Sequence, residues 1–121
     1  MKRFLILSAF CLTLTACPAT TTAPPTAPGY ANQTDQQMGE ILAAARAFYT
    51  TVQQDSANGS MTLTTAQKSA FNAFGVSLNA AESVYLAYHA QPTAANQAAA
   101  QTAVNNIQTQ QAALPLPTVT K

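Results

Sequence analysis

The chain has 121 residues, enough for one small domain, and only 7% of them are charged, against about 25% in a typical soluble protein. The formal net charge is +1, and after residue 16 the four acidic and three basic residues form no cluster of either sign. Binding of nucleic acid needs a basic stripe that neutralises phosphates, so we expect no nucleic-acid partner.

Residues 1–16 have the organisation of an export signal. Lys2 and Arg3 form a basic n-region, and the apolar run 4–14 has the length of the core of a cleaved signal. A membrane-spanning helix needs about 20 apolar residues, so this run is too short to remain in a bilayer. We therefore expect residues 1–16 to direct export and then to be removed.

The end of this signal carries a recognisable motif. The sequence Leu14-Thr15-Ala16-Cys17 resembles the lipobox of bacterial lipoproteins, with Leu three positions before the cysteine and two small residues between them. The resemblance implies that Cys17 receives a thioether-linked diacylglycerol, because a thiolate is the best side-chain nucleophile for alkylation. It further implies that signal peptidase II cleaves between Ala16 and Cys17, and that the new amino terminus is acylated. No other cofactor is expected. The alternative is an ordinary secreted protein whose signal ends near a cysteine.

The same resemblance implies a location. The mature chain would be anchored in the cell envelope through its lipid, with the membrane as its first partner. Pro18 follows the cysteine, where Asp in enteric bacteria favours retention in the inner membrane, so the outer membrane, on its periplasmic or surface face, is favoured. Cys11 leaves with the signal and Cys17 carries lipid, so we expect no disulfide in the mature chain.

Residues 17–31 read as the lipid anchor and a Pro/Thr-rich linker. Prolines favour the extended polyproline II conformation, and the twelve residues from Pro18 to Gly29 would then reach up to ~35 Å at ~3.1 Å per residue. The alternative is a tether of no particular length. Tyr30 directly follows these twelve residues and is assigned no role.

Residues 32–114 predict a small antiparallel three-helix bundle, an all-α fold. The first helix is expected at about 34–57, with Thr34 and Gln37 as a capping box and Asn58-Gly59 at its end. Its apolar stripe consists of Met38, Ile41, Leu42, Ala45, Phe48, Tyr49 and Val52.

The second helix is expected at about 64–91, with Thr64 and Gln67 as its capping box and Pro92 as its stop. Gly75 within it would allow a close approach of another helix. Its apolar stripe consists of Phe71, Phe74, Leu78, Ala81, Tyr85 and Tyr88, widened by Val84 and Leu86.

The third helix is expected at about 93–113, capped by Thr93, and residues 115–121 form a tail. Its expected core side chains are few, and some of them are small: Ala100, Ala103, Val104, Ile107 and Leu114. A helix that buries so little area leaves self-association open, because a second copy would bury more.

No set of residues predicts an enzyme. His89 is the only histidine, and Glu82 lies seven residues before it on the same helix face. Two side chains do not complete a metal site of three or four ligands, so no metal is expected. No nucleophile motif accompanies them, and His89 near a helix C-terminus is well placed to interact with the helix dipole.

The sequence therefore predicts a lipid-anchored structural or protein-interaction module that presents a neutral, amide-rich surface to an envelope partner. Three alternatives stay open. The aromatic side chains of the first two helices could line a pocket for a small apolar ligand; they are Phe48, Tyr49, Phe71, Phe74, Tyr85 and Tyr88. The terminal Lys121 is similar to that of the murein lipoprotein, whose terminal lysine is joined to peptidoglycan, which implies a wall tether. A lipoprotein of a phage or mobile element is also compatible with the small size.

Overall fold

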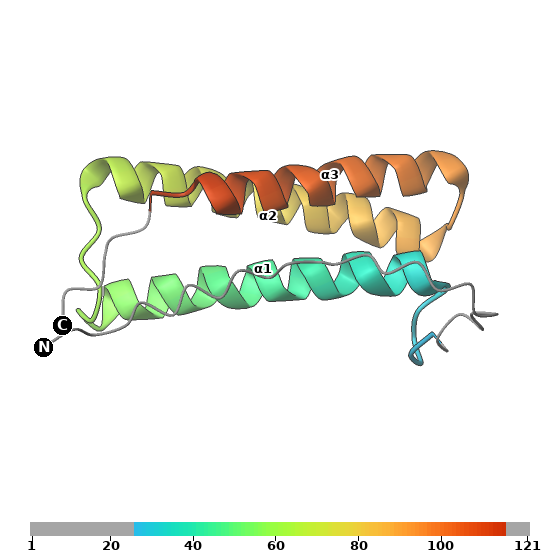
Figure 1. Ribbon diagram of the computed structural model, residues 1–121, viewed down its shortest axis with the longest axis horizontal. Coiled ribbons are helices and arrows are strands. Elements are labelled where there is room, and N and C mark those ends of the chain that lie inside the picture. Colours follow the sequence, from blue (N-terminus) through green and yellow to red (C-terminus); the bar gives the residue numbers. More distant parts are fainter. Residues whose placement is uncertain (1–25, 116–121) are drawn as a thin grey trace, which may run out of the picture.

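Three antiparallel helices make up most of the chain in the computed structural model, which describes residues 26–115 (Figure 1). They are α1 (Gln33–Ala57), α2 (Thr65–Ala90) and α3 (Ala94–Ala113), and each contacts the other two. The described residues contain no strand. The predicted all-α three-helix bundle is confirmed, and every predicted helix end lies within one residue of the observed one. The predictions for Ala16, Cys17 and Lys121 lie outside the described residues.

Two helix starts have the predicted caps. At α2, the Thr64 hydroxyl accepts the Gln67 N–H at 3.3 Å, and the Gln67 side chain accepts the Thr64 N–H at 2.8 Å. At α3, the Thr93 hydroxyl accepts the Asn96 N–H at 3.2 Å. These bonds satisfy donors that have no partner within a helix, which is why both helices begin where they do.

The predicted cap of α1 is wrong. Thr34 lies inside the helix, and the cap is Asn32, whose side-chain oxygen accepts the Asp35 N–H at 2.9 Å. Asn is as good a cap as Thr, and starting the helix there places Asp35 in the first turn, where its carboxylate accepts the Ala31 N–H at 2.8 Å. The end of α1 is as predicted, with Gly59 at φ +80° after Asn58.

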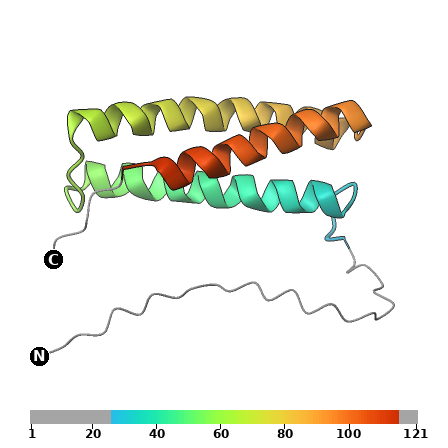
Figure 2. The same ribbon diagram turned by 45° about the horizontal axis from the view of Figure 1, so that its top comes forward.

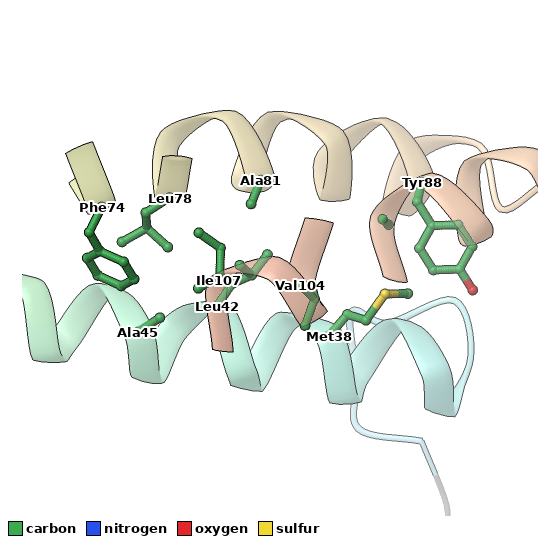
Figure 3. Packing of buried hydrophobic residues seen from close by; sticks show 10 residues of the cluster. Met38, Leu42, Ala45, Phe74, Leu78, Ala81, Tyr88, Val104 and Ile107 are labelled. Carbon is green, nitrogen blue, oxygen red and sulfur yellow. The ribbon is translucent and has the colours of Figure 1, made fainter. Parts of the chain in front are cut away.

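The main core draws side chains from all three helices, which converge along the bundle axis in Figure 3. Its buried members are Met38, Leu42 and Ala45 from α1, Phe74, Leu78, Ala81 and Tyr88 from α2, and Ala100, Val104 and Ile107 from α3. These are the predicted stripes, with one error. Leu86 is 59% exposed rather than part of the core, because eight residues of helix turn it roughly 80° away from Leu78.

A second cluster closes the end of the bundle where α1 turns into α2. It consists of Val52, Leu63 and Phe71, and Tyr49 stacks on Phe71 with ring centroids 4.6 Å apart. A Cβ on Gly75 would lie 2.5 Å from the Tyr49 hydroxyl oxygen, so only glycine leaves room for this ring. Gly75 thus lets the Tyr49 ring of α1 lie directly against α2, while the close helix approach expected at this glycine stays a prediction. In the rotated view of Figure 2, α3 crosses in front of this pair.

Candidate functional site

Six polar and aromatic side chains meet at the opposite end of the bundle, where the chain enters α1 and α2 ends. We call them the Asp35 cluster: Tyr30, Asn32, Asp35, Tyr85, Tyr88 and His89. Asp35 has no exposed surface and is the one buried charged residue among those that the structure describes. Carboxylates are rarely buried without specific partners, so the neighbours of Asp35 must compensate for its lost hydration.

One oxygen of Asp35 carries most of its contacts. Oδ2 lies 2.8 Å from the Ala31 N–H donor and 2.8 Å from His89 Nδ1, which reaches across from the last turn of α2. The other oxygen, Oδ1, is buried and accepts no hydrogen bond of ordinary geometry. The Tyr85 hydroxyl faces the same carboxylate. The side chain of His89 keeps 38% of its surface exposed, so the Asp35–His89 contact is buried only on the carboxylate side.

These contacts decide the charge state of Asp35. Burial by itself raises the pKa of the carboxyl, but the Ala31 N–H, the His89 ring and the Tyr85 hydroxyl together outweigh burial. The pKa of Asp35 therefore lies below its ordinary value, and the carboxylate is charged at neutral pH. The pKa of Tyr85 is raised, first by burial and then by the facing carboxylate. Tyr85 is consequently a neutral hydrogen-bond donor.

The remaining members hold the cluster in place. The hydroxyl of Tyr88, which is 1% exposed, lies 3.0 Å from Asn32 Nδ2 and 3.1 Å from its Oδ1, so the cap of α1 also satisfies a buried phenol of α2. The Tyr30 ring meets the His89 ring edge-on at 6.3 Å between centroids. A Cβ on Gly39 would lie 2.7 Å from the Tyr85 hydroxyl and 2.9 Å from the Tyr30 ring, so Gly39 makes room for both.

The cluster fixes the segment that leads into α1, which we call the strap, residues 26–32. Its Ala27 N–H donates to the Gln36 side chain at 2.8 Å, and its Ala31 N–H donates to Asp35. Gly29, with φ +96°, turns the strap, and Tyr30 N–H closes the turn onto the Ala27 carbonyl at 3.3 Å. The sequence predicted residues up to 31 as linker, whereas Ala27 and Ala31 are hydrogen-bonded to α1 and Tyr30 packs against His89 of α2.

The predicted proximity of His89 and Glu82 does not produce a pair. Glu82 instead accepts two hydrogen bonds from Arg46 of α1, with Nε 2.8 Å from Oε1, and Arg46 also reaches Asn79 at 2.6 Å. His89 does lie in the last turn of α2, as predicted, but its partner is Asp35. Sequence reasoning missed Asp35, because the two residues are 54 positions apart and no local pattern joins them.

An Asp–His pair of this kind orients an imidazole and can move a proton at Nε2. Acid–base chemistry also needs a bound substrate beside that nitrogen, and the rings of Tyr30 and Tyr85 occupy two sides of His89. Within residues 26–115, no group of three or more His, Cys, Asp or Glu side chains is arranged to hold a metal ion. The geometry of the Asp35 cluster thus favours fixing the strap over chemistry on a ligand.

The aromatic side chains that suggested a pocket for an apolar ligand pack largely against one another. Phe48, Tyr49, Phe71 and Phe74 lie with centroids 4.6–6.4 Å apart, a spacing typical of packed aromatic cores. Beside them, an open pocket of about 330 Å³ lies at the α1–α2 turn. Its lining combines Val52, Leu63 and Phe71 with polar Gln53, Ser56, Lys68 and Asn72, and with Ala57.

Comparison with known proteins adds no relative. No protein-family model matches the chain, and neither the curated proteins nor the solved structures gave a match. Among the three helices of residues 26–115, none combines the length and apolarity needed to cross a lipid bilayer.

Proposed function

We propose that this protein is a lipid-anchored module of the cell envelope that acts by binding another envelope component rather than by catalysis. The observation that carries the proposal is the sequence Leu14-Thr15-Ala16-Cys17, placed directly after a basic n-region and a short apolar run. Four features coincide there: the basic start, the apolar run, the two small residues and the cysteine. Each has a separate role in export or in lipid attachment.

The character of the bundle surface supports an interaction role. Between Ala94 and Ala113, α3 has no charged residue, and its exposed positions are mainly Ala, Gln, Asn and Thr. Such a surface has little long-range field, so a partner would be selected by shape and amide hydrogen bonds rather than by electrostatic steering.

Lipid attachment is tested by substituting each cysteine in turn. Cys17→Ser should abolish incorporation of labelled palmitate and move the protein out of the membrane fraction. The matched control is Cys11→Ser, which alters a signal residue of the same type and should change neither readout. A Cys17→Ser protein that still carries label and still sediments with membranes would overturn the proposal.

The wall tether through Lys121 is a second candidate. It is favoured by one observation, namely that α3 ends at the opposite end of the bundle from the start of α1 (Figure 1). A chain fixed at both ends of such a bundle would bridge two envelope layers. In that case the protein should leave the cell wall only after muramidase digestion, and Lys121→Arg, which removes the reactive amine but keeps the charge, should free it. Complete extraction by detergent alone would count against the tether.

A further inference from the structure

We propose that the Asp35 cluster is a clasp that holds the strap on the end of the bundle and thereby limits how far the bundle stands from the membrane. The inference rests on the proposed lipid anchor at Cys17. It adds a role for residues that the anchor itself does not require.

The contacts of the strap are made with side chains of both α1 and α2, which distinguishes a clasp from an ordinary helix start. Gln36 and Asp35 of α1 accept backbone N–H groups of the strap at 2.8 Å each. From α2, Tyr88 bonds Asn32, and His89 packs edge-on against Tyr30. A helix cap alone needs only Asn32, so the other contacts serve to fix the chain before the helix.

The burial of Asp35 makes these contacts depend on one another. Its carboxylate is shielded from water and is stabilised by one donor from the strap and one from α2. Releasing the strap removes the Ala31 N–H from Oδ2 and exposes the His89 side of the cluster. The clasp should therefore open as a unit, because a half-satisfied buried carboxylate is unfavourable.

The consequence is a change in reach. From Cys17 to Thr26, where the clasped part begins, the chain advances nine residues, or up to ~28 Å at ~3.1 Å per residue. With the strap released, sixteen residues would separate Cys17 from Gln33, or up to ~50 Å. The clasp therefore removes close to half of the available tether and keeps the α2–α3 turn, at the same end, near the lipid.

The test measures stand-off from the membrane in the full chain, purified from the host and bound to vesicles of phosphatidylethanolamine and phosphatidylglycerol. A donor dye is placed by Gln91→Cys at the clasp end, or by Ser60→Cys at the α1–α2 turn, and acceptor dye is carried on lipid headgroups. Both positions are exposed. We expect more energy transfer from position 91 than from position 60.

Two variants open the clasp in different ways. Asp35→Asn removes the buried charge, and Tyr30→Ala removes a half-buried strap ring without touching the core, so one test remains if the other variant unfolds. Each should lower transfer from position 91, and exchange of the bonded strap amides, Ala27 and Ala31, should quicken by at least ~10-fold while α3 stays protected. Thr26→Ala, at an exposed strap position, is the matched control and should change neither.

The outcomes separate the clasp from the anchor. Unchanged transfer and unchanged strap exchange in both variants, with α3 still protected, would overturn the clasp while leaving the anchor intact. A wild-type chain that does not bind the vesicles, or whose Cys17 thiol reacts with the dye, would overturn the anchor and with it the clasp's effect on stand-off.

Discussion

Asp35 is a fully buried carboxylate in a chain with only four acidic residues. Its hydrogen bonds from Ala31 and His89 offset the loss of hydration, and they join the strap, α1 and α2 at a single atom, Oδ2. Hydrogen bonds to charged groups contribute roughly 1.5–3 kcal/mol each, more than neutral ones, so single substitutions here should have measurable effects.

Replacing Asp35 by Ala should lower the free energy of unfolding by about 2–3 kcal/mol, because it leaves the imidazole and the strap amide without their acceptor. Urea unfolding followed by circular dichroism measures this. The control is Asp55→Ala on the same helix, which lacks a side-chain hydrogen bond among the described contacts and should change stability by no more than about 0.5 kcal/mol. Equal losses in the two variants would show that the Asp35 contacts contribute nothing specific.

The lowered pKa of Asp35 predicts how stability depends on pH. A carboxyl whose folded pKa lies below its unfolded value of about 3.9 contributes stability that is complete above that value. The contribution is lost as the pH falls through the folded pKa. Between pH 6 and pH 2 the urea midpoint of the wild type should thus fall more than that of Asp35→Asn. Parallel curves for the two proteins would contradict the charged, stabilised carboxylate.

At the scale of single helices, local rules predicted the starts of α2 and α3 but not that of α1. Thr34 with Gln37 and Asn32 with Asp35 are both reasonable caps, and local sequence does not rank them. The choice is decided by a partner 54 residues away, since the Asn32 start brings Asp35 to His89. The same limit applies to Arg46 and Glu82, which are 36 residues apart.

With Asn32 as the cap of α1, we expect alanine substitution to cost much more stability at position 32 than at position 34. Asn32→Ala should cost about 1 kcal/mol or more, because it removes the acceptor of the Asp35 N–H and the partner of Tyr88. Thr34→Ala should change stability by less than about 0.5 kcal/mol, since Thr34 caps nothing. Thermal unfolding of the two variants side by side checks this, and a larger loss for Thr34→Ala would restore the cap that the sequence suggested.

The packing of Tyr49 on Gly75 can be tested by asking whether the stability effect of Gly75→Ala changes sign when the Tyr49 ring is removed. Gly75→Ala should gain up to about 1 kcal/mol from helix propensity yet be net destabilising, because the new Cβ meets the Tyr49 ring. In a Tyr49→Leu background the ring is absent, and the same substitution should become neutral or stabilising. The unfolding free energies of the wild type, the two single variants and the double variant give the coupling energy between positions 49 and 75. A stabilising Gly75→Ala in the wild-type background would show that Tyr49 moves aside freely.

At the scale of the whole molecule, the apolar stripes predicted the bundle because their spacing matched the helical period and their ends coincided with turns and caps. The Asp35 cluster was not predictable in the same way. It depends on which helix faces meet, and on glycine at position 39 making room for two tyrosine rings. Long-range pairs of polar groups leave no periodic signal in the sequence.

The third helix buries little apolar area, so each of its few large core side chains should contribute strongly to the free energy of unfolding. Ile107, 1% exposed, contacts the core formed by α1 and α2, and Ile107→Ala should cost about 2–4 kcal/mol. Val76 is 70% exposed, and Val76→Ala should stay within about 0.5 kcal/mol. Urea unfolding of both compares a core and a surface truncation. Similar losses would indicate that the Val76 face is buried against another molecule in solution.

The lipid anchor that we propose for this bundle is tested most directly by the intact mass of the mature protein isolated from the cell envelope. Our account predicts a chain that begins at Cys17 and carries one diacylglycerol on sulfur and one acyl group on its amino terminus. It also predicts that inhibition of signal peptidase II leaves residues 1–16 attached. An unmodified chain, or one whose first residue is not Cys17, would contradict it.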